Sequence, residues 1–473
     1  MTFGATGLTM KIHIFVDKLS GLLLCAITVL VICEEWGLTG WAYPLKPLLV
    51  LALVAILTTQ VRLSRKVFVL VALGLSIALA STNPDWLDIV IRGLAAAAFI
   101  GAFFTALSTL RAVAQTSPAI QRAGAFLAEQ KPGRRYAALT LGGQAFALVL
   151  SYGSLQLLGA LAMASAKTEL NAEIREHRIR RMLLAIQRAF VSCLPWSPLS
   201  FGMVITLSVI PDTSWTQALV PGLVSSCILA GIGWGLDTAF KPNLTVTSAR
   251  RAPSETWAAM LPLLALLVVM VVGVVTLHEM TGVRIVGLVA VLVPTIALIW
   301  LLIQHWADAP LKNICVRIRD YVLWELPDYR GELVLLMMAG YIGTVGSHLL
   351  APIMLNAGMD LSVVSPWVIL VSLVWIIPLA GQIGMNPILA VTLIVPLIPD
   401  AASLGVQPTA IIVALTSGWA LSGASSPFTA TTLLIGSFAS ISALRVGLVW
   451  NGVYSLICGL VLSLWVLVYA FVI

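Results

Sequence analysis

Residues 364–398 read VSPWVILVSLVWIIPLAGQIGMNPILAVTLIVPLI, an apolar run of 35 residues. A straight helix of that length would extend about 52 Å at ~1.5 Å per residue, whereas the hydrocarbon core of a membrane is about 30 Å thick. Glycines, a glutamine, an asparagine and a proline interrupt the apolar run at Gly381–Pro387, called the second tip here. We therefore predict a helical hairpin that enters and leaves the membrane on the same side, with its tip buried in protein or lining a water-filled cavity.

A second stretch with the same character lies earlier in the chain, at residues 136–165. Its apolar run is interrupted by Ser151-Tyr152-Gly153-Ser154, called the first tip. Because this run is also too long for one straight crossing, we predict a second re-entrant hairpin.

The composition places the whole chain in a membrane. Of its 473 residues 60% are hydrophobic and only 10% are charged, whereas a soluble domain carries roughly 25% charged residues. A soluble protein is excluded, and we expect no nucleic-acid partner despite the net charge of +7. The fold class expected is an all-α polytopic membrane protein with about eleven transmembrane helices plus the two hairpins. The eleven apolar runs lie at 18–36, 43–60, 67–82, 86–110, 183–210, 216–237, 257–277, 284–304, 333–356, 408–438 and 446–473.

Charge placement predicts the orientation. If the N-terminus is cytoplasmic and each hairpin returns to its own side, 24 of the 27 Lys and Arg residues fall on the cytoplasmic side. This split agrees with the positive-inside rule, and a full crossing at either hairpin would destroy it. We therefore predict a multi-pass protein of the inner (plasma) membrane with an external C-terminus. The basic stretch 173–188 is expected to be a helix end lying on anionic lipid.

Two helices after the hairpins carry matching interruptions. Ser197-Pro198-Leu199-Ser200, the first break, follows the first hairpin, and Ser426-Pro427-Phe428-Thr429 follows the second. Residues 425–429, which add Ser425 to this run, are called the second break. Proline removes a backbone donor and disfavours helix at the preceding residue. Because an odd number of crossings separates the two halves, we predict an inverted repeat.

The repeat predicts the organisation of the chain. Residues 1–36 form an extra N-terminal helix, and residues 239–256 form a cytoplasmic linker. The first inverted repeat spans 37–238, with scaffold helices, the inner hairpin at 136–165 and a broken helix at 183–210. The second spans 257–473, with scaffold helices, the outer hairpin at 364–398 and a broken helix at 408–438.

Interrupted helices that meet at the midplane are typical of the substrate site of secondary transporters. A broken helix exposes N–H groups at one end, which attract an anion, and C=O groups at the other, which coordinate a cation. We expect both tips and both breaks to form one central site. The predicted substrate-binding residues are Ser151, Gly153, Ser154, Ser197, Pro198, Ser200, Gly384, Asn386, Pro387, Ser425, Ser426, Pro427 and Thr429.

On these motifs the chain resembles the ion transporter superfamily, most closely the divalent anion/sodium symporter family. The resemblance is carried by Trp-Ser-Pro-Leu-Ser at 196–200 and Ser-Ser-Pro-Phe-Thr at 425–429. Gly384-Met385-Asn386-Pro387 is also similar to the large membrane subunit of tripartite periplasmic transporters. The resemblance implies an elevator-type transporter, in which a transport domain slides against a scaffold that forms a homodimer.

The function expected is secondary active transport of a small organic anion, coupled to Na⁺ or H⁺. Ser151, Asn386 and Ser426 are candidate Na⁺ ligands, and His348, inside an apolar run, is a candidate proton relay. The expected partners are the anionic substrate, membrane lipid and a second copy of the chain; we expect no cofactor beyond Na⁺ and no enzymatic activity. Two alternatives stay open: a membrane-embedded enzyme acting on a lipid-linked substrate, and a passive anion channel.

The orientation makes a direct prediction for Asp400, which follows the second hairpin. In a cysteine-free background, Asp400→Cys is expected to react with a membrane-impermeant maleimide added outside intact cells, because residue 400 lies on the external side. Lys167→Cys, in a predicted cytoplasmic loop, is the matched control and is expected to react only after lysis. Labelling of Asp400→Cys from the cytoplasmic side alone would contradict the topology.

Overall fold

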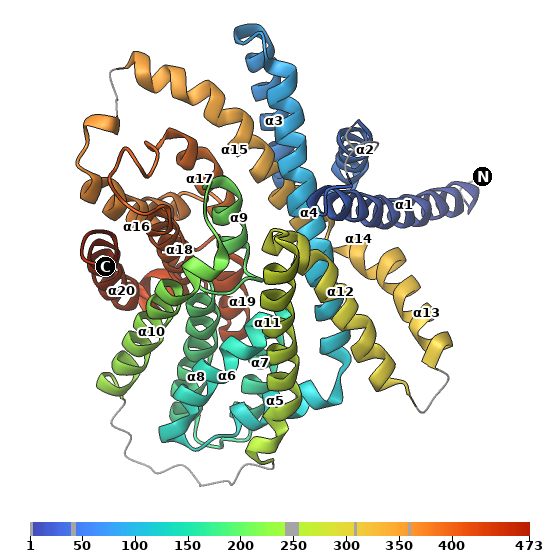
Figure 1. Cartoon of the computed structure of the whole chain (residues 1–473). Coiled ribbons are helices and arrows are strands. Elements are labelled where there is room, and N and C mark those ends of the chain that lie inside the picture. The colour runs from blue at the N-terminus through green and yellow to red at the C-terminus, as the bar shows by residue number, and fades with distance from the viewer. Residues whose placement is uncertain (1–2, 39–43, 242–254, 307–309, 358–360) are drawn as a thin grey trace. The chain divides into compact units, whose positions relative to one another are not determined.

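The computed structural model describes residues 3–38, 44–241, 255–306, 310–357 and 361–473, and these residues form helices joined by short turns (Figure 1). Nine helices in this part of the chain are long and apolar enough to span a membrane. They coincide with nine of the eleven expected runs, which confirms an all-helical polytopic membrane protein. Of the other two runs, 43–60 gives a shorter helix, α2 (Leu45–Gln60), and 183–210 is divided between two helices. Residues 242–254 of the predicted linker lie outside the described residues.

The chain divides into two compact units. Unit 1 comprises residues 1–113, 276–359 and 392–396, and unit 2 comprises 114–275, 360–391 and 397–473. The helices of unit 1 are α1 (Phe3–Glu35), α2, α3 (Leu63–Thr82), most of α4 (Trp86–Thr116), α12 (Ile285–Gln304), α13 (Pro310–Asp320), the π-helical turn η2 (Tyr321–Glu325), α14 (Leu326–Asp328) and α15 (Arg330–Asn356). Both units draw on both halves of the sequence, so the compact units cut across the predicted repeats, and the repeat assignment itself stays a prediction.

Unit 2 holds the elements around the predicted tips and breaks. They are α5 (Pro118–Ala128), α6 (Pro132–Leu150), α7 (Tyr152–Lys167), α8 (Ala172–Cys193), α9 (Phe201–Val209), α10 (Trp215–Ala239), most of α11 (Leu261–Thr281), α16 (Pro366–Gln382), most of α17 (Pro387–Ile394), α18 (Pro408–Ser425), α19 (Ala430–Ala439), the π-helical turn η5 (Arg445–Trp450) and α20 (Gly452–Phe471). Short 3₁₀ turns lie at Trp257–Met260, Leu361–Val363 and Val395–Leu397.

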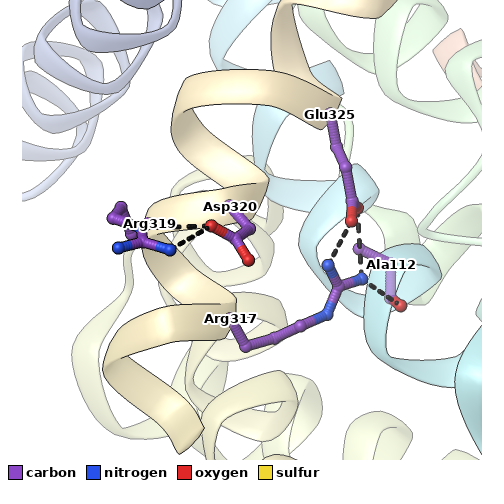
Figure 2. A network of polar contacts seen from close by, with 5 residues as sticks. All are labelled: Ala112, Arg317, Arg319, Asp320 and Glu325. Carbon is purple, nitrogen blue, oxygen red and sulfur yellow. Dashed lines mark hydrogen bonds and ion pairs between the residues drawn. The ribbon is translucent and has the colours of Figure 1, made fainter. Parts of the chain in front are cut away.

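In unit 1 an ionic network holds the arm formed by α13 and η2 against the end of α4. Figure 2 shows Arg317 between two partners: its Nη2 donates to the carbonyl oxygen of Ala112 at 2.8 Å, and the same guanidinium pairs with Glu325. Arg319 forms a separate ion pair with its neighbour Asp320 at 2.9 Å. Because Arg317 bonds both to a carboxylate and to a backbone carbonyl near the end of α4, it fixes where the arm lies.

The centre of unit 2 is α18, which is buried from Thr409 to Ser425. It packs against α16 on one side and α8 on another, and α8 also packs against α6 and α7. Small residues allow the close approach: a methyl carbon added at Gly418 would lie 2.7 Å from the carbonyl oxygen of Leu373, and one at Gly423 would lie 3.0 Å from the side chain of Val191. Close packing of this kind drives helix association where the hydrophobic effect is weak.

We expect Gly418→Ala to destabilise unit 2 by about 1–3 kcal/mol, because the new methyl group meets a backbone carbonyl that cannot rotate away. Gly235→Ala in α10 is the matched control, since nothing lies within 4 Å of its added carbon. The unfolding temperature of Gly235→Ala in detergent should equal or exceed that of the unchanged protein. Equal unfolding temperatures for the two variants would contradict the close α16–α18 contact.

Candidate functional site

The first tip is a sharp turn at Ser151, where α6 ends and α7 begins. Ser151 has φ 49° and ψ −130°, a backbone conformation that residues other than glycine seldom adopt. The backbone N–H of Ser154 donates to the carbonyl oxygen of Ser151 at 3.0 Å, and its hydroxyl donates to the same oxygen at 2.7 Å. Gly153 and Ser154 are buried, and α6 and α7 pack against each other. The first tip is therefore a tight turn between two packed helices.

The first break lies between α8, which ends at Cys193, and α9, which begins at Phe201. The hydroxyl oxygen of Ser200 accepts from the backbone N–H of Met203 at 3.1 Å, which caps α9, and this hydroxyl donates to the carbonyl oxygen of Leu194 at 2.9 Å. The oxygen of Ser197 accepts from the N–H of Leu199 at 3.1 Å. Both serines therefore satisfy backbone groups that the interruption leaves without helical partners.

The structure brings the first tip and the first break together. Ser151 and Tyr152 of the tip line one small pocket with Ser197 and Ser200 of the break, and Trp419 of α18 completes the wall. The serine side chains provide hydroxyl groups, and Trp419 and Tyr152 provide aromatic surface. The pocket has a volume of about 20 Å³, which is room for roughly one water molecule.

The second tip joins α16 to α17. Gly384 has φ +90°, a conformation that favours glycine, and the side-chain oxygen of Asn386 accepts from the N–H of Ile388 at 2.8 Å. Asn386 therefore caps the start of α17. Beyond Val391 the chain passes from unit 2 to unit 1, where Thr392 lies against Gly343 of α15. Within the predicted outer hairpin, residues 364–391 and 397–398 thus belong to unit 2, and only residues 392–396 belong to unit 1.

The second break is bonded directly to the second tip. Ser426 is 1% exposed, and its hydroxyl donates to the carbonyl oxygen of Gly381 at 2.7 Å. The side-chain N–H of Gln382 donates to the hydroxyl oxygen of Ser425 at 3.4 Å. A methyl carbon at Gly381 would lie 3.0 Å from the β-carbon of Ser426, so this close approach requires a small residue. Two segments 45 residues apart therefore meet at one point.

Past the second break, α19 begins at Ala430 with an uncapped first turn. Thr429 occupies the N-cap position, but its side chain makes no capping bond to the helix. The hydroxyl of Thr432 donates instead to the carbonyl oxygen of Ser426 at 2.6 Å. The N–H groups of the first turn carry the positive end of the helix dipole, so the start of α19 favours an anion.

A buried polar network supports the second break, and the sequence patterns did not reveal it. Gln187 of α8 is fully buried, and its side-chain N–H donates to the carbonyl oxygen of Ala424 at 3.3 Å. Asn451 donates to the side-chain oxygen of Gln187 at 3.0 Å, and Arg188 donates through Nε to the side-chain oxygen of Asn451 at 3.1 Å. Through Gln187, the network donates a hydrogen bond to a carbonyl that has no helical partner where α18 ends. The only sequence signal was three polar residues inside apolar runs.

The turn η5 lies directly behind the second break. A β-carbon added at Gly447 would lie 2.0 Å from the carbonyl oxygen of Ser425, so only glycine allows this contact. The side chain of Asn451, which follows η5, also donates to the carbonyl oxygen of Val446 at 3.1 Å. Single π-helical turns inside helices often accompany functional sites, and here the turn packs against Ser425 of the predicted site.

All thirteen predicted substrate-binding residues lie in unit 2. The contacts above unite each tip with its own break, so the structure arranges the predicted site as two pairs. The three candidate Na⁺ ligands are divided between them: Ser151 belongs to the first pair, and Asn386 and Ser426 belong to the second. His348 lies in unit 1, with its Nδ1 2.8 Å from the carbonyl oxygen of Thr344 in the same helix.

Comparison with known proteins finds the fold of this chain in solved structures. No family model matches the sequence, and no curated protein does. Two solved structures match over most of their length: the YdaH transporter of Alcanivorax borkumensis (TM-score 0.56, 15% identity, 85% of this chain and 98% of that chain) and MtrF of Neisseria gonorrhoeae (TM-score 0.55, 14% identity, 89% and 97%). The chain shares their fold. The finer resemblance to the ion transporter superfamily stays a prediction.

The bond between the second tip and the second break can be tested with two buried serines: Ser426, which follows the end of α18, and Ser417, which lies inside α18. Ser426→Ala removes the hydroxyl that bonds to Gly381, and we expect a loss of about 0.5–1.5 kcal/mol in stability together with faster amide exchange at 381–386. Ser417→Ala is the matched control, because its fully buried hydroxyl has no partner among the described residues. We expect no loss of stability there. Unchanged exchange at 381–386 in Ser426→Ala would contradict this bond.

Proposed function

We propose that the protein is a secondary active transporter that moves a small organic anion across the membrane by an elevator mechanism. The observation that carries the proposal is the second pair, where a buried helix stops, a hairpin tip bonds to the stop, and a new helix starts with an uncapped first turn. A transporter needs a site of this kind, which binds through the backbone and can be exposed to either side of the membrane.

The chemistry of the two pairs supports an anionic substrate. None of the residues 151–154, 194–200, 383–386 and 426–429 is acidic or basic. Binding would therefore come from N–H dipoles and hydroxyl groups, which favour a negative group at the start of α19.

The compact units support an elevator. Both pairs lie in unit 2, so in this proposal unit 2 carries the substrate, and unit 1 is the scaffold through which two copies form a homodimer. The two proteins with the same fold are described as a transporter and as a member of a class of antimetabolite efflux pumps, which supports transport but leaves uptake and export equally open.

The coupling ion in this proposal is Na⁺ or H⁺. A Na⁺ ion would bind to carbonyl oxygens and the hydroxyl groups of Ser151 or Ser426, with the side-chain oxygen of Asn386 as a further ligand. A proton would instead use His348 or the substrate itself. If the coupling ion is Na⁺, transport requires external Na⁺.

The proposal is tested in proteoliposomes of the purified chain with radiolabelled succinate, citrate and lactate as separate probes. We expect at least one probe to accumulate against its gradient when an inward Na⁺ or H⁺ gradient is imposed, and Ser426→Ala with Thr429→Ala to reduce the rate at least tenfold. Ser417→Ala is expected to transport like the unchanged protein.

Replacing Na⁺ with choline distinguishes the two ions: loss of accumulation supports Na⁺, and loss only with a protonophore supports H⁺. Accumulation of no probe, or a steady ohmic current in place of accumulation, would contradict secondary active transport. Full activity of the double variant in properly folded protein would contradict the second break as the site.

A further inference from the structure

Unit 2 contains a second cavity, which the two pairs do not use. It has a volume of about 360 Å³ and lies among α8, α10 and the junction of η5 with α20. Its lining includes three arginines of α8 and two aromatic residues near the junction. They are Arg180, Arg181, Arg188, Trp450 and Tyr454, with Asp237 of α10.

Arg188 is a buried charge in this lining, 5% exposed. Its Nε donates to Asn451 and its Nη1 to the hydroxyl oxygen of Tyr136 at 3.2 Å and the carbonyl oxygen of Gly233 at 3.4 Å. Its guanidinium carbon lies 4.4 Å from the ring centroid of Tyr454. All of these partners are neutral, and no described residue accepts from Nη2. A buried guanidinium without a counter-charge is costly in a membrane, so Arg188 is suited to receive an anion.

The rest of the lining adds positive charge. Arg181 is matched by Asp237, to which it donates two hydrogen bonds of 2.7 and 2.6 Å. Arg180 lies over the ring of Trp450 at 5.5 Å, and neither it nor Arg188 forms an ion pair with any described residue. Two of the three guanidinium groups are therefore unmatched in the cavity.

The neighbourhood of the cavity is also strongly basic. The pKa of Arg135, at the start of α6, is lowered to about 10, first because the side chain is buried and then because Arg178 and Arg181 are close, while Glu169 acts in the opposite direction. Arg135 and Arg178 therefore add basic residues beside the lining, with Glu169 as a nearby acidic one.

The rim of the cavity is apolar and exposed. Phe240, Val449 and Val453 are 73%, 66% and 55% exposed, and Leu456 and Leu460 continue the exposed apolar surface along α20. A free anion would gain nothing from this surface. An amphiphile would use both features, with its charged group in the cavity and an acyl chain along α20.

We propose that this cavity binds the phosphate group of an anionic phospholipid from the leaflet that we expect to be cytoplasmic. Arginine donates two parallel hydrogen bonds to phosphate, and basic pockets between membrane helices are suited to lipid headgroups. Tryptophan is enriched at the level of the headgroups, so Trp450 in the lining agrees with a lipid ligand. This site is distinct from the two pairs, so its test does not depend on transport.

The test uses the full-length purified chain in neutral detergent, with its thermal unfolding followed as lipid is added. We expect dioleoylphosphatidylglycerol to raise the unfolding temperature in a saturable way, whereas dioleoylphosphatidylcholine and inorganic phosphate at equal concentrations do not. Arg180→Gln is expected to weaken phosphatidylglycerol binding about fivefold, which corresponds to the loss of one basic residue near a lipid headgroup at ~1 kcal/mol.

Arg188→Gln should weaken binding more strongly, and if it does not fold, Arg180→Gln decides the question because its side chain is exposed. Arg175→Gln, on the same helix and outside the lining, is the matched control and should bind like the unchanged protein. Equal weakening by Arg175→Gln and Arg180→Gln would show general surface attraction and overturn the proposal. Equal stabilisation by inorganic phosphate would show a site for free anions and overturn the lipid assignment.

Discussion

A helix that stops inside a membrane leaves carbonyl and N–H groups without partners, and unit 2 is built around satisfying them. At the second break the carbonyl oxygen of Gly381 is satisfied by Ser426, that of Ser426 by Thr432, and that of Ala424 by Gln187. At the first break Ser197 and Ser200 serve the same purpose. Since the start of α19 is left uncapped by its own N-cap residue, it is the place where a ligand could complete the set.

The sequence predicted the positions of these interruptions because their causes are local. Proline at 427 and glycine at 384 act on the backbone within one or two residues, and α18 ends two residues before Pro427. The helix α8 ends at Cys193, two residues before Pro195 and five before Pro198. The interruption after α8 is longer than the predicted Ser197–Ser200, because the chain leaves the helix already after Cys193. Ser151 takes the left-handed conformation where a glycine would be the ordinary choice.

The parts that could not be predicted depend on contacts between distant segments. Gln187 and Asn451 are 264 residues apart, and nothing in either local sequence indicates that they meet. The division of the chain into two compact units is also a property of packing, since each unit combines segments of both halves. Arg188 counted in the sequence only as one more basic residue near the cytoplasm. The structure instead buries it in a network that ends at the second break.

This network gives the two regions of unit 2 a physical connection. From the arginine cavity, hydrogen bonds run through Arg188, Asn451 and Gln187 to the carbonyl oxygens that end α18. The three side chains are joined by hydrogen bonds to neutral partners, and only Nη2 of Arg188 has no acceptor among the described residues. The same residues therefore hold the cavity and the second break in fixed positions relative to each other.

We expect both interrupted segments to turn back inside the membrane, each beside its own broken helix. A cryo-EM map of the full chain in lipid nanodiscs tests this most directly, because it places the backbone against the bilayer. We expect Ser151 and Gly384 to lie within the hydrocarbon layer, with the carbonyl of Gly381 bonded to Ser426. A map in which either segment crosses the bilayer completely, or in which either turn lies at the membrane surface, would contradict the claim.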